Sequence, residues 1–446
     1  MATHIEYTPS SSPTGIQQTI SFWMKRSELG TDQCVFEARQ NSTNMSTIKF
    51  NTNDELQIYS ENGGTTNVYV KTNRRFRDPN GWYHIVYAID TSQGTASDRI
   101  KMYINGVQET SFSSSTYPSQ NYDNFWYGIA QKQVIGRDNQ GGGSEDFQGI
   151  LSHFHYSRGY VYQASTFGST DSTTGEWKIT TSPSGVNYGA TGWFILKDGN
   201  SVTDQSGNGN NFTVGSGTLT KTEDNPSNIF ATLNPLVNYY ANSTFSNGNN
   251  TVVTDASTYA TTLSTLGMSS GKYYCEIKAT NIYNGLARFG ISGSEPSSNG
   301  FGNAADEYVF MANSGQKRNN NTTSSYSGVA WNSGDIIGIA VDLDNNYIYF
   351  SRNGSWINSG NPASGASGTN AAFSLGTPST GFYHFGVNDA DNAGGSSNTY
   401  DANFGNGFFG TTAITSAGSN GNGSLFEYDV PSGYYALNTK NINTYG

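Results

Sequence analysis

Charge, cysteine and long apolar runs are all scarce in this chain of 446 residues. Only 13% of the residues are charged, and 34 Asp and Glu outnumber 23 Lys and Arg, which gives a net charge of −11. A phosphate-binding surface needs clustered basic residues, so we expect no nucleic acid partner. No apolar run is long enough to span a bilayer, so we expect no membrane insertion.

The two cysteines, Cys34 and Cys275, fall in what are predicted below to be different domains. Neither domain would then have an internal disulfide partner, and its stability must come from core burial. The start of the chain, MATHIEYTPSSSP, lacks the basic and apolar regions of a secretory signal. We therefore expect a soluble protein that is made in a cytoplasm.

Glycine and aromatic residues are abundant by contrast, with 53 Gly and 29 Tyr. This composition is typical of many short strands joined by tight turns, and it predicts an all-β protein. The length suits two or three domains of about 100–200 residues each.

Two stretches, 81–109 and 334–356, share one hairpin pattern. Each runs from a strand through a polar loop to a second strand and then to an Asn-Gly pair, at 105–106 and 353–354. Asn-Gly readily accepts the positive φ angles of a tight hairpin turn. The repeat is too long for a solenoid period and indicates two domains of related architecture.

Alternation along these hairpins sorts their side chains onto two faces. One apolar set would face a core: Ile100, Met102, Ile348 and Phe350. A second set would lie on the opposite face and cover it or form a subunit contact: Lys101, Tyr103, Tyr347 and Tyr349. The hairpins are therefore predicted to be scaffold and not binding sites.

Further short strands are predicted in both halves, at 19–27, 34–40, 46–52, 55–61, 67–73, 148–157, 191–198, 271–280, 286–294, 307–313, 383–389 and 425–430. Such spacing indicates two antiparallel, jelly-roll-like β-sandwiches in tandem, at 1–220 and 241–446. Between them, 221–240 is predicted to be a linker because Pro226 and Pro235 punctuate a stretch without strand alternation.

Several segments carry a family resemblance. ISFWMKRSELG, FRDPNGWYHIVYAID, RIKMYINGVQ and DQSGNGNNFTV resemble a laminin-G-like, concanavalin A-type lectin/glucanase domain, in the variant found in structural proteins of tailed phages, particularly marine and cyanobacterial ones. DNPSNIFATLNPL resembles the connector of those proteins. GKYYCEIKA, RFGIS, WNSGDIIGIAVDLDNNYIYFSRNG, YHFGVND, ANFGNGFF and VPSGYYALNT follow the motif order of a SPRY domain. Both resemblances imply two-sheet antiparallel sandwiches and together cover nearly the whole chain.

Catalytic constellations are not found in the sequence. Glycoside hydrolysis needs two carboxylates across the scissile bond, and the Glu-x-Asp-x-x-Glu strand of glucanases with this fold has no match. There is no Gly-x-Ser-x-Gly elbow. Of the five histidines, His153 and His155 would share one strand face, but no third ligand stands at metal-site spacing. We expect neither an enzyme nor a metal site.

Calcium was considered because lectin-like and laminin-G-like domains often bind it. Asp342 and Asp344 begin like an EF-hand loop, but Tyr347 and Asn353 stand where Gly and Glu are needed. Asp138, Glu145 and Asp146 bracket a Gly-rich loop where such domains can hold the ion, but LSHFHY replaces the acidic pair that often follows. The residues allow calcium without supporting it, and no cofactor is assigned.

Aromatic side chains are the remaining signal for a ligand. Sugar sites combine flat apolar faces with polar groups for the hydroxyls, and NYDNFWYG concentrates Tyr122, Phe125, Trp126 and Tyr127 beside Asn and Asp. The alternative is that these rings fill the core of a Tyr-rich sandwich. In the second half, Arg318 and Tyr326 in the loop 315–328 are candidates because SPRY domains generally bind partners through end loops, and a solvated loop is the alternative.

The resemblance implies a virion structural protein, synthesised in a host bacterial cytoplasm and exposed on the particle as a tail- or capsid-attached fibre, knob or decoration protein. It would contact other virion proteins and host-surface polysaccharide, and we expect a homo-oligomer. The alternative is a dedicated carbohydrate-binding adhesin, and a polysaccharide-degrading enzyme is disfavoured.

Overall fold

The computed structural model describes residues 3–12, 15–139, 145–197, 199, 201–240, 242–255, 258–283, 285–296, 300–390, 395–415, 418 and 423–446. Contacts divide the chain into two units, Met1–Lys221 and Thr222–Gly446. The predicted all-β fold with two antiparallel sandwiches in tandem is confirmed.

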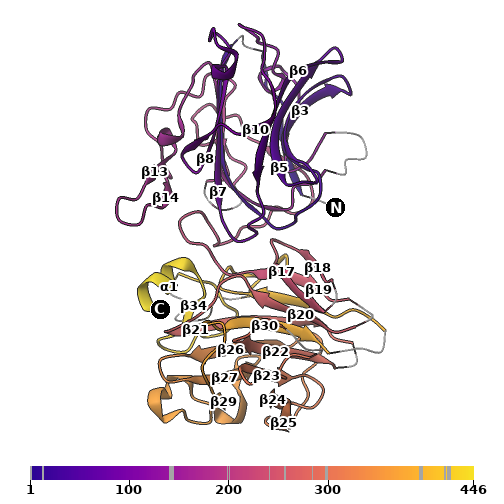
Figure 1. Ribbon diagram of the computed structural model, residues 1–446, viewed down its shortest axis with the longest axis vertical. Helices are drawn as coiled ribbons and strands as arrows, with labels where there is room; N and C mark the ends of the chain where they lie inside the picture. Colours follow the sequence, from indigo (N-terminus) through magenta and orange to yellow (C-terminus); the bar gives the residue numbers. More distant parts are fainter. Residues whose placement is uncertain are drawn as a thin grey trace. The chain divides into compact units, whose positions relative to one another are not determined.

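Two sheets make up the sandwich of the first unit (Figure 1). In spatial order, one described sheet contains β10 (Phe112–Thr116), β6 (Thr65–Arg75), β5 (Glu55–Asn62), β4 (Asn44–Phe50), β3 (Gln33–Asn41), β11 (Gln133–Ile135), β1 (His4–Tyr7) and β16 (Thr213–Ser216). The other contains β15 (Trp193–Ile195), β12 (Gly149–Arg158), β2 (Gln17–Arg26), β7 (Tyr83–Asp90), β8 (Ile100–Ile104) and β9 (Val107–Glu109). We call them the long sheet and the short sheet.

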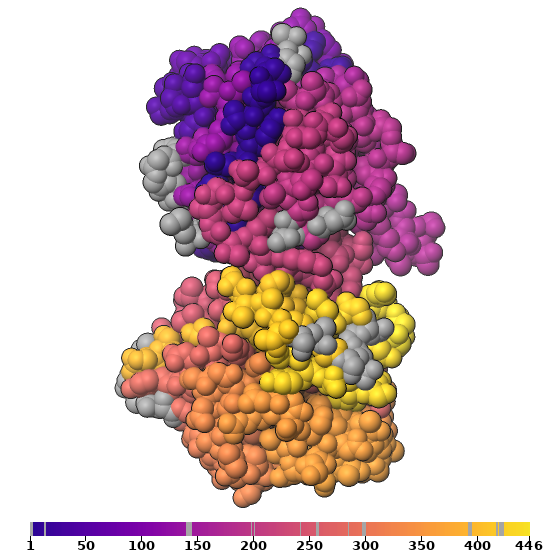
Figure 2. Space-filling model, turned by 180° about the vertical axis from the view of Figure 1, so that it is seen from behind, coloured from indigo at the N-terminus to yellow at the C-terminus, as the bar shows by residue number. Residues whose placement is uncertain are grey.

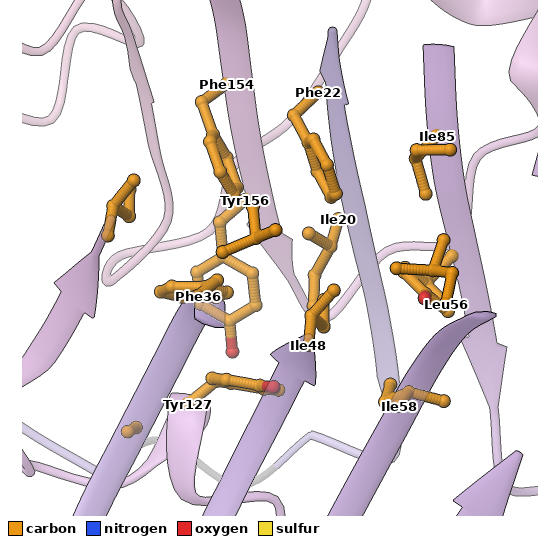
Figure 3. Close-up of a cluster of buried hydrophobic side chains, with 14 of the residues drawn as sticks. Ile20, Phe22, Phe36, Ile48, Leu56, Ile58, Ile85, Tyr127, Phe154 and Tyr156 are labelled. Atoms are coloured by element: carbon orange, nitrogen blue, oxygen red, sulfur yellow. The ribbon is translucent and has the colours of Figure 1, made fainter. Parts of the chain in front are cut away.

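The core of the first unit lies between these sheets, because alternate residues of each strand point inward. Figure 3 shows Phe22 and Phe154 from the short sheet close to one another, with ring centroids 4.7 Å apart. Phe36 and Ile48 reach them from the long sheet, and all four side chains are fully buried.

A small hairpin, β13 (Gly168–Thr170) and β14 (Trp177–Ile179), lies outside the short sheet (Figure 1). It belongs to the segment that covers the outer face of β7 and β8, where Val86, Ala88 and Tyr103 pack against Phe167 and its neighbours. Short 3-10 helices complete the described elements of this unit: η1 (Ala96–Asp98), η2 (Trp126–Gly128) and η3 (Ala164–Thr166).

Two further sheets make up the second unit. One contains, in order, β17 (Leu233–Tyr240), β20 (Ala260–Ser264), β30 (His384–Asp389), β22 (Ala287–Ser292), β23 (Glu307–Met311), β24 (Gln316–Asn319) and β25 (Thr322–Ser325). The other contains β18 (Thr244–Ser246), β19 (Thr251–Val253), β31 (Thr399–Asn403), β21 (Lys272–Asn281), β26 (Ile336–Asp342), β27 (Tyr347–Arg352) and β28 (Ser355–Trp356), with β29 (Phe373–Ser374) on β27 and β34 (Tyr435–Ala436) on β21. Smaller elements are β32 (Phe408–Phe409), β33 (Thr412–Ala413), η4 (Ile357–Ser359), η5 (Pro362–Ser367) and α1 (Thr439–Tyr445).

The outer face of β26 and β27 is also covered, here by the end of the chain. Ala340 and Tyr349 pack with Phe426, Val430 and Tyr434 in a cluster separate from the main core. Figure 2 shows the C-terminal segment, in yellow, on the surface of the second unit. Tyr349 is only 1% exposed, so of the two roles predicted for it, a place in the covered sheet face is the one that this burial supports.

Residues 222–240 of the predicted linker, 221–240, instead belong to the second unit. Phe230 is buried, the Ala231 N–H donates to the Leu437 carbonyl (2.9 Å), and β17 pairs with β20. Pro235 lies in β17 at the edge of its sheet, where the pairing register shifts. Proline is tolerated at such edge positions because no ladder hydrogen bond is needed there, so its presence did not exclude a strand.

The shared hairpin pattern is present in both units, as β7–β8 and β26–β27. Both turn asparagines have positive φ, 47° at Asn105 and 49° at Asn353. Each side-chain oxygen accepts a hydrogen bond from the first strand of its hairpin, from the N–H of His84 on β7 (2.7 Å) and from that of Ile336 on β26 (2.8 Å). The four predicted core residues, Ile100, Met102, Ile348 and Phe350, are buried.

Each turn glycine is closed by an aromatic ring from later in the chain. A Cβ added at Gly106 would overlap the Trp177 ring, and one added at Gly354 would lie 2.6 Å from Tyr428. Tyr428 lies in the stretch 425–430, which was wrongly predicted to be a strand: the described structure there has a single bridge, between Asn406 and Leu425. The segment serves as a cover and not as a sheet strand.

Candidate functional site

The four aromatics predicted to bind sugar lie in the core of the first unit. Phe125 and Tyr127 are fully buried, and Tyr122 and Trp126 are each 7% exposed. Tyr127 stacks on Phe36 with ring centroids 4.5 Å apart, as Figure 3 shows. The ligand role is therefore wrong for this cluster, and the alternative, a core role, is correct.

Hydrogen bonds explain why this loop turns inward. The backbone N–H of Trp126 donates to Ser46 Oγ (3.0 Å), and its indole N–H donates to the Glu61 carbonyl (2.9 Å). Both partners lie on strands of the long sheet. With its polar group satisfied, the indole can be buried without a desolvation penalty.

Tyr326 in the second unit is also a core residue, 8% exposed. Its ring packs edge-on against Phe310, with centroids 5.4 Å apart, and burial raises the pKa of its hydroxyl. The burial of this side chain therefore gives no support to a role in partner binding. Arg318, the other candidate, is only half-buried and lies on β24.

The outer face of the long sheet presents aromatic and polar side chains that the sequence analysis did not single out. Tyr59 on β5 and Tyr69 on β6 are paired across the strands, and their half-buried rings meet edge-to-face at 5.8 Å. One row along, Gln57 is paired with Lys71, and its amide oxygen accepts a bond from the Tyr69 hydroxyl (3.4 Å). We call Lys49, Gln57, Tyr59, Tyr69 and Lys71 the tyrosine face.

Charged groups at the tyrosine face are held in pairs. Lys49 Nζ bonds both carboxylate oxygens of Glu145 (2.9 and 3.0 Å), and Lys71 Nζ lies 3.2 Å from a Glu55 oxygen. The Tyr59 hydroxyl donates to Glu61 (2.6 Å). These contacts fix the side chains before any ligand arrives, which lowers the entropic cost of binding.

The pKa values at this face follow from the same contacts. Burial acts to lower the pKa of Lys49, but the hydrogen bond and charge of Glu145 outweigh it, and the pKa is raised. A hydrogen bond from Asn51 and the charge of Lys71 lower the pKa of Glu55. Lys49 and Glu55 are therefore charged at neutral pH.

The signal for the tyrosine face was present in the sequence. Both tyrosines alternate with buried residues, Ile58 in ELQIYSE and Val68 and Val70 in NVYVKTN, within two strands that were predicted correctly as neighbours along the chain. Only the pairing register, which brings Tyr59 opposite Tyr69, was missing.

His84 and His155 are buried on the outer side of the short sheet. The Trp177 indole N–H donates to His84 Nδ1 (3.0 Å), so the neutral ring carries its proton on Nε2 and donates to Ser21 Oγ (2.9 Å). His155 stacks on Phe194 at 3.8 Å. Burial lowers the pKa of His84 to about 3 and that of His155 well below its usual range. Both rings anchor the covering segment.

Within the described ranges, no group of three or more His, Cys, Asp and Glu side chains is placed to hold a metal ion. Glu145 is engaged by Lys49, and Asp146 lies 3.5 Å from Arg137. Part of the predicted calcium loop, 140–144, lies outside the described residues, so calcium stays a prediction without support.

Comparisons with known proteins agree with this architecture. Residues 2–164 match the family described as the concanavalin A-like lectin/glucanases superfamily, and residues 272–382 match the SPRY domain family. The chain carries a concanavalin A-like domain followed by a SPRY domain. The strands β1 to β12 of the two sheets lie within the first match, and Arg318 lies within the second. No curated protein matched the chain.

Solved structures similar to the chain include the SPRY domain of human HERC1, with 16% identity and a TM-score of 0.31, covering 38% of this chain and 96% of that one. A heptameric SAP-like pentraxin from Limulus polyphemus has 15% identity and a TM-score of 0.30 over 49% of this chain and 90% of that one. A human SPRY domain has 15% identity and a TM-score of 0.27 over 34% and 90%. In the described part of the chain, no helix is long and apolar enough to cross a membrane.

Proposed function

We propose that this is a non-enzymatic binding protein of the phage virion surface. Its concanavalin A-like domain would bind host-surface polysaccharide at the tyrosine face, and its SPRY domain would contact other virion proteins. The pairing of Tyr59 with Tyr69 beside Gln57 and Lys71 is the observation that carries the glycan assignment.

Carbohydrate is the ligand class that this surface suits best. A pyranose ring presents an apolar face, which packs on an aromatic ring, and hydroxyls, which need donors and acceptors. The tyrosine face offers both within one pair of strands, and its two lysines are each paired with a carboxylate, Lys49 with Glu145 and Lys71 with Glu55. A neutral polysaccharide therefore fits better than a highly charged one.

A binding role is favoured over catalysis because the carboxylates of this face are engaged in other contacts. A glycosidase acid needs a raised pKa, and the pKa of Glu55 is lowered by Asn51 and Lys71. Glu61 accepts the Tyr59 hydroxyl. We expect no release of reducing ends when the protein is incubated with host polysaccharide, and release that Glu55→Gln and Glu61→Gln abolish would refute the non-enzymatic assignment.

The decisive experiment is binding of the labelled full-length protein to bacterial cells and to their extracted polysaccharide. Tyr59→Ala and Tyr69→Ala are each expected to weaken binding about tenfold, by analogy with the loss of about 1–3 kcal/mol when a stacking ring is removed. Tyr160→Ala is the matched control, because this tyrosine is exposed in the same domain and its backbone contacts the other sheet, at Thr19.

Three outcomes separate the hypotheses. Saturable binding that free polysaccharide competes away, and that only the Tyr59 and Tyr69 variants lose, supports the glycan role. Equal loss in the Tyr160 variant refutes the assignment to the tyrosine face. Stoichiometric recovery with purified particles supports a virion component, whereas glycan binding without such recovery favours the dedicated adhesin.

A further inference from the structure

The outer face of β22, β23 and β24 in the SPRY domain carries two neighbouring arginines. Arg288 on β22 is paired with Met311, and Arg318 on β24 is paired with Val309, so both guanidinium groups extend from the same face, on either side of β23. The charge of Arg318 contributes, after burial, to lowering the pKa of Arg288 to about 10. Both groups are charged at neutral pH.

A side-chain amide lies between the two guanidinium groups. Asn303 Oδ1 accepts bonds from Arg318 Nε (3.0 Å) and Nη2 (2.7 Å), while Arg288 Nη1 donates to the Phe301 carbonyl (2.9 Å). The position of a Cβ added at Gly300 would be 2.8 Å from Arg288 Nη1 and 3.1 Å from Asn303 Nδ2. Two donors from different elements, Arg288 Nη1 and Asn303 Nδ2, thus face the backbone at Gly300, where residue 300 itself has no side chain.

The charge of Glu307 acts on Arg288, but among the described residues neither arginine is held in an ion pair. In the part of the chain that the structure describes, no ion pair joins Arg288 or Arg318 to a carboxylate. The nearby carboxylate of Glu307 is buried and accepts three backbone N–H groups, those of residues 302–304, at 2.8–2.9 Å. Its charge therefore holds the loop in place. In a protein with a net charge of −11, two guanidinium groups that lie side by side and have no ion-pair partner among the described carboxylates point to an anionic ligand.

The surroundings indicate what kind of molecule carries the anion. The floor beside the arginines is apolar, formed by Leu263, Phe301 and Val309. Arg318 Nη1 also donates to Thr323 Oγ1 (2.9 Å) on β25, the last strand of its sheet as described, whose four residues are all exposed. An open strand edge offers main-chain hydrogen bonds to another polypeptide, whereas a polysaccharide has no backbone amides to pair with it.

We propose that Arg288, Asn303 and Arg318 form a carboxylate-binding site for an acidic peptide segment that lies in extended form along the outer edge of β25. The site deepens the protein-contact role proposed for the SPRY domain. It is independent of the tyrosine face, so failure of glycan binding and failure of peptide binding can be told apart in one preparation.

The test uses the full chain and a fluorescein-labelled hexaglutamate peptide, followed by fluorescence anisotropy in 0.15 M salt, where the Debye length of about 8 Å limits the effect of distant charges. Arg288→Gln and Arg318→Gln are each expected to weaken binding about tenfold, because each removes a charge-assisted hydrogen bond. Arg318→Lys, which keeps the charge without the planar fork, is expected to fall between the wild type and Arg318→Gln.

Gly300→Ala tests the space beside Gly300, between Arg288 and Asn303, without removing a charge. The φ angle of Gly300 lies outside the left-handed range, and the added methyl meets only the ends of side chains, so the domain should fold. The variant should bind the peptide about tenfold more weakly. Arg75→Gln, at an exposed arginine of the other domain, is the matched control and should stay within about twofold of the wild type.

Competition then identifies the ligand class. Unlabelled hexaglutamate should displace the probe at least tenfold better than an oligogalacturonate of equal charge or inorganic phosphate. No saturable binding by the wild type, or an equal loss in Arg75→Gln, overturns the site. Equal competition by the oligogalacturonate, with the same dependence on Arg288 and Arg318, overturns the peptide assignment in favour of an acidic glycan. Competition by phosphate alone overturns it in favour of a site for small anions.

Discussion

Glu276 gives the SPRY domain a dependence on pH that can be worked out from its contacts. The carboxyl group is fully buried on β21. It accepts backbone N–H bonds from Glu427 (2.8 Å) and Tyr428 (2.9 Å), and the Tyr274 hydroxyl donates to it at 3.1 Å. Burial nevertheless dominates and raises its pKa from 4.5 to about 7.

The sign follows from proton linkage. Between the unfolded pKa near 4.5 and the folded pKa near 7, the folded state binds more protons than the unfolded state. The stabilisation is therefore complete below pH 4.5 and is lost as the pH rises through 7. At about 1.4 kcal/mol per pKa unit, the free energy of unfolding should fall by about 3 kcal/mol between pH 4.5 and 7.

The assay is denaturant unfolding of the full chain at pH 5 and pH 7.5, with the transition of the SPRY domain assigned by the Glu276→Gln variant. This variant mimics the protonated form, so it should lose the pH dependence. It should also be less stable than the wild type at pH 5, because one amide oxygen replaces two acceptors. Glu295→Gln, at an exposed carboxyl in the same unit, is the control and should behave as the wild type. Equal pH dependence in the wild type and Glu276→Gln would refute the reasoning.

Three other substitutions test separate contacts. Because burial lowers the pKa of His84 to about 3, lowering the pH from 7 to 5 should cost the wild type about 2 kcal/mol at this residue, and His84→Gln should remove that loss in a denaturation series. Asp54→Ala leaves the fully buried Arg26 without its 3.0 Å carboxylate partner and should cost about 3–5 kcal/mol, whereas Asp54→Asn, which tolerates the φ of 64°, should cost less by the same denaturant midpoints. Gly354→Ala should destabilise the SPRY domain because residue 354 has a φ of 77° and because the new methyl group would collide with Tyr428. In a double-mutant cycle, adding Tyr428→Ala should therefore cost less stability in the Gly354→Ala background than in the wild type.

The hairpins show which parts of the fold the sequence could predict. Their turns and core positions follow from local chemistry, because Asn-Gly favours one turn geometry and alternation selects one face. Which residues cover the other face of each hairpin could not be predicted from neighbouring residues in the sequence. Tyr103 and Tyr349 look alike in a strand pattern, and only segments distant in the chain, around Phe167 and Phe426, decide that both are buried.

The sequence could not identify the candidate site, for a related reason. A cluster such as NYDNFWYG has the same composition whether its rings face a sugar or a core, and here the bonds of Trp126 to Ser46 and Glu61 decide for the core. The tyrosine face depends on register, which brings Tyr59 opposite Tyr69. Arg318 was a candidate in the sequence, but its neighbour Arg288 comes from another strand and could not be associated with it from spacing.

The aromatic rings that close the two hairpin turns also set an order of events during synthesis. Trp177 and Tyr428 leave the ribosome well after the glycines they cover, Gly106 and Gly354. A nascent chain can therefore form each hairpin early, from neighbouring residues. The outer side of that sheet stays exposed to solvent until the later segment has been synthesised. In each domain, the cover would be placed after the hairpin that it covers, and a chain stalled before that step would expose apolar sheet to its surroundings.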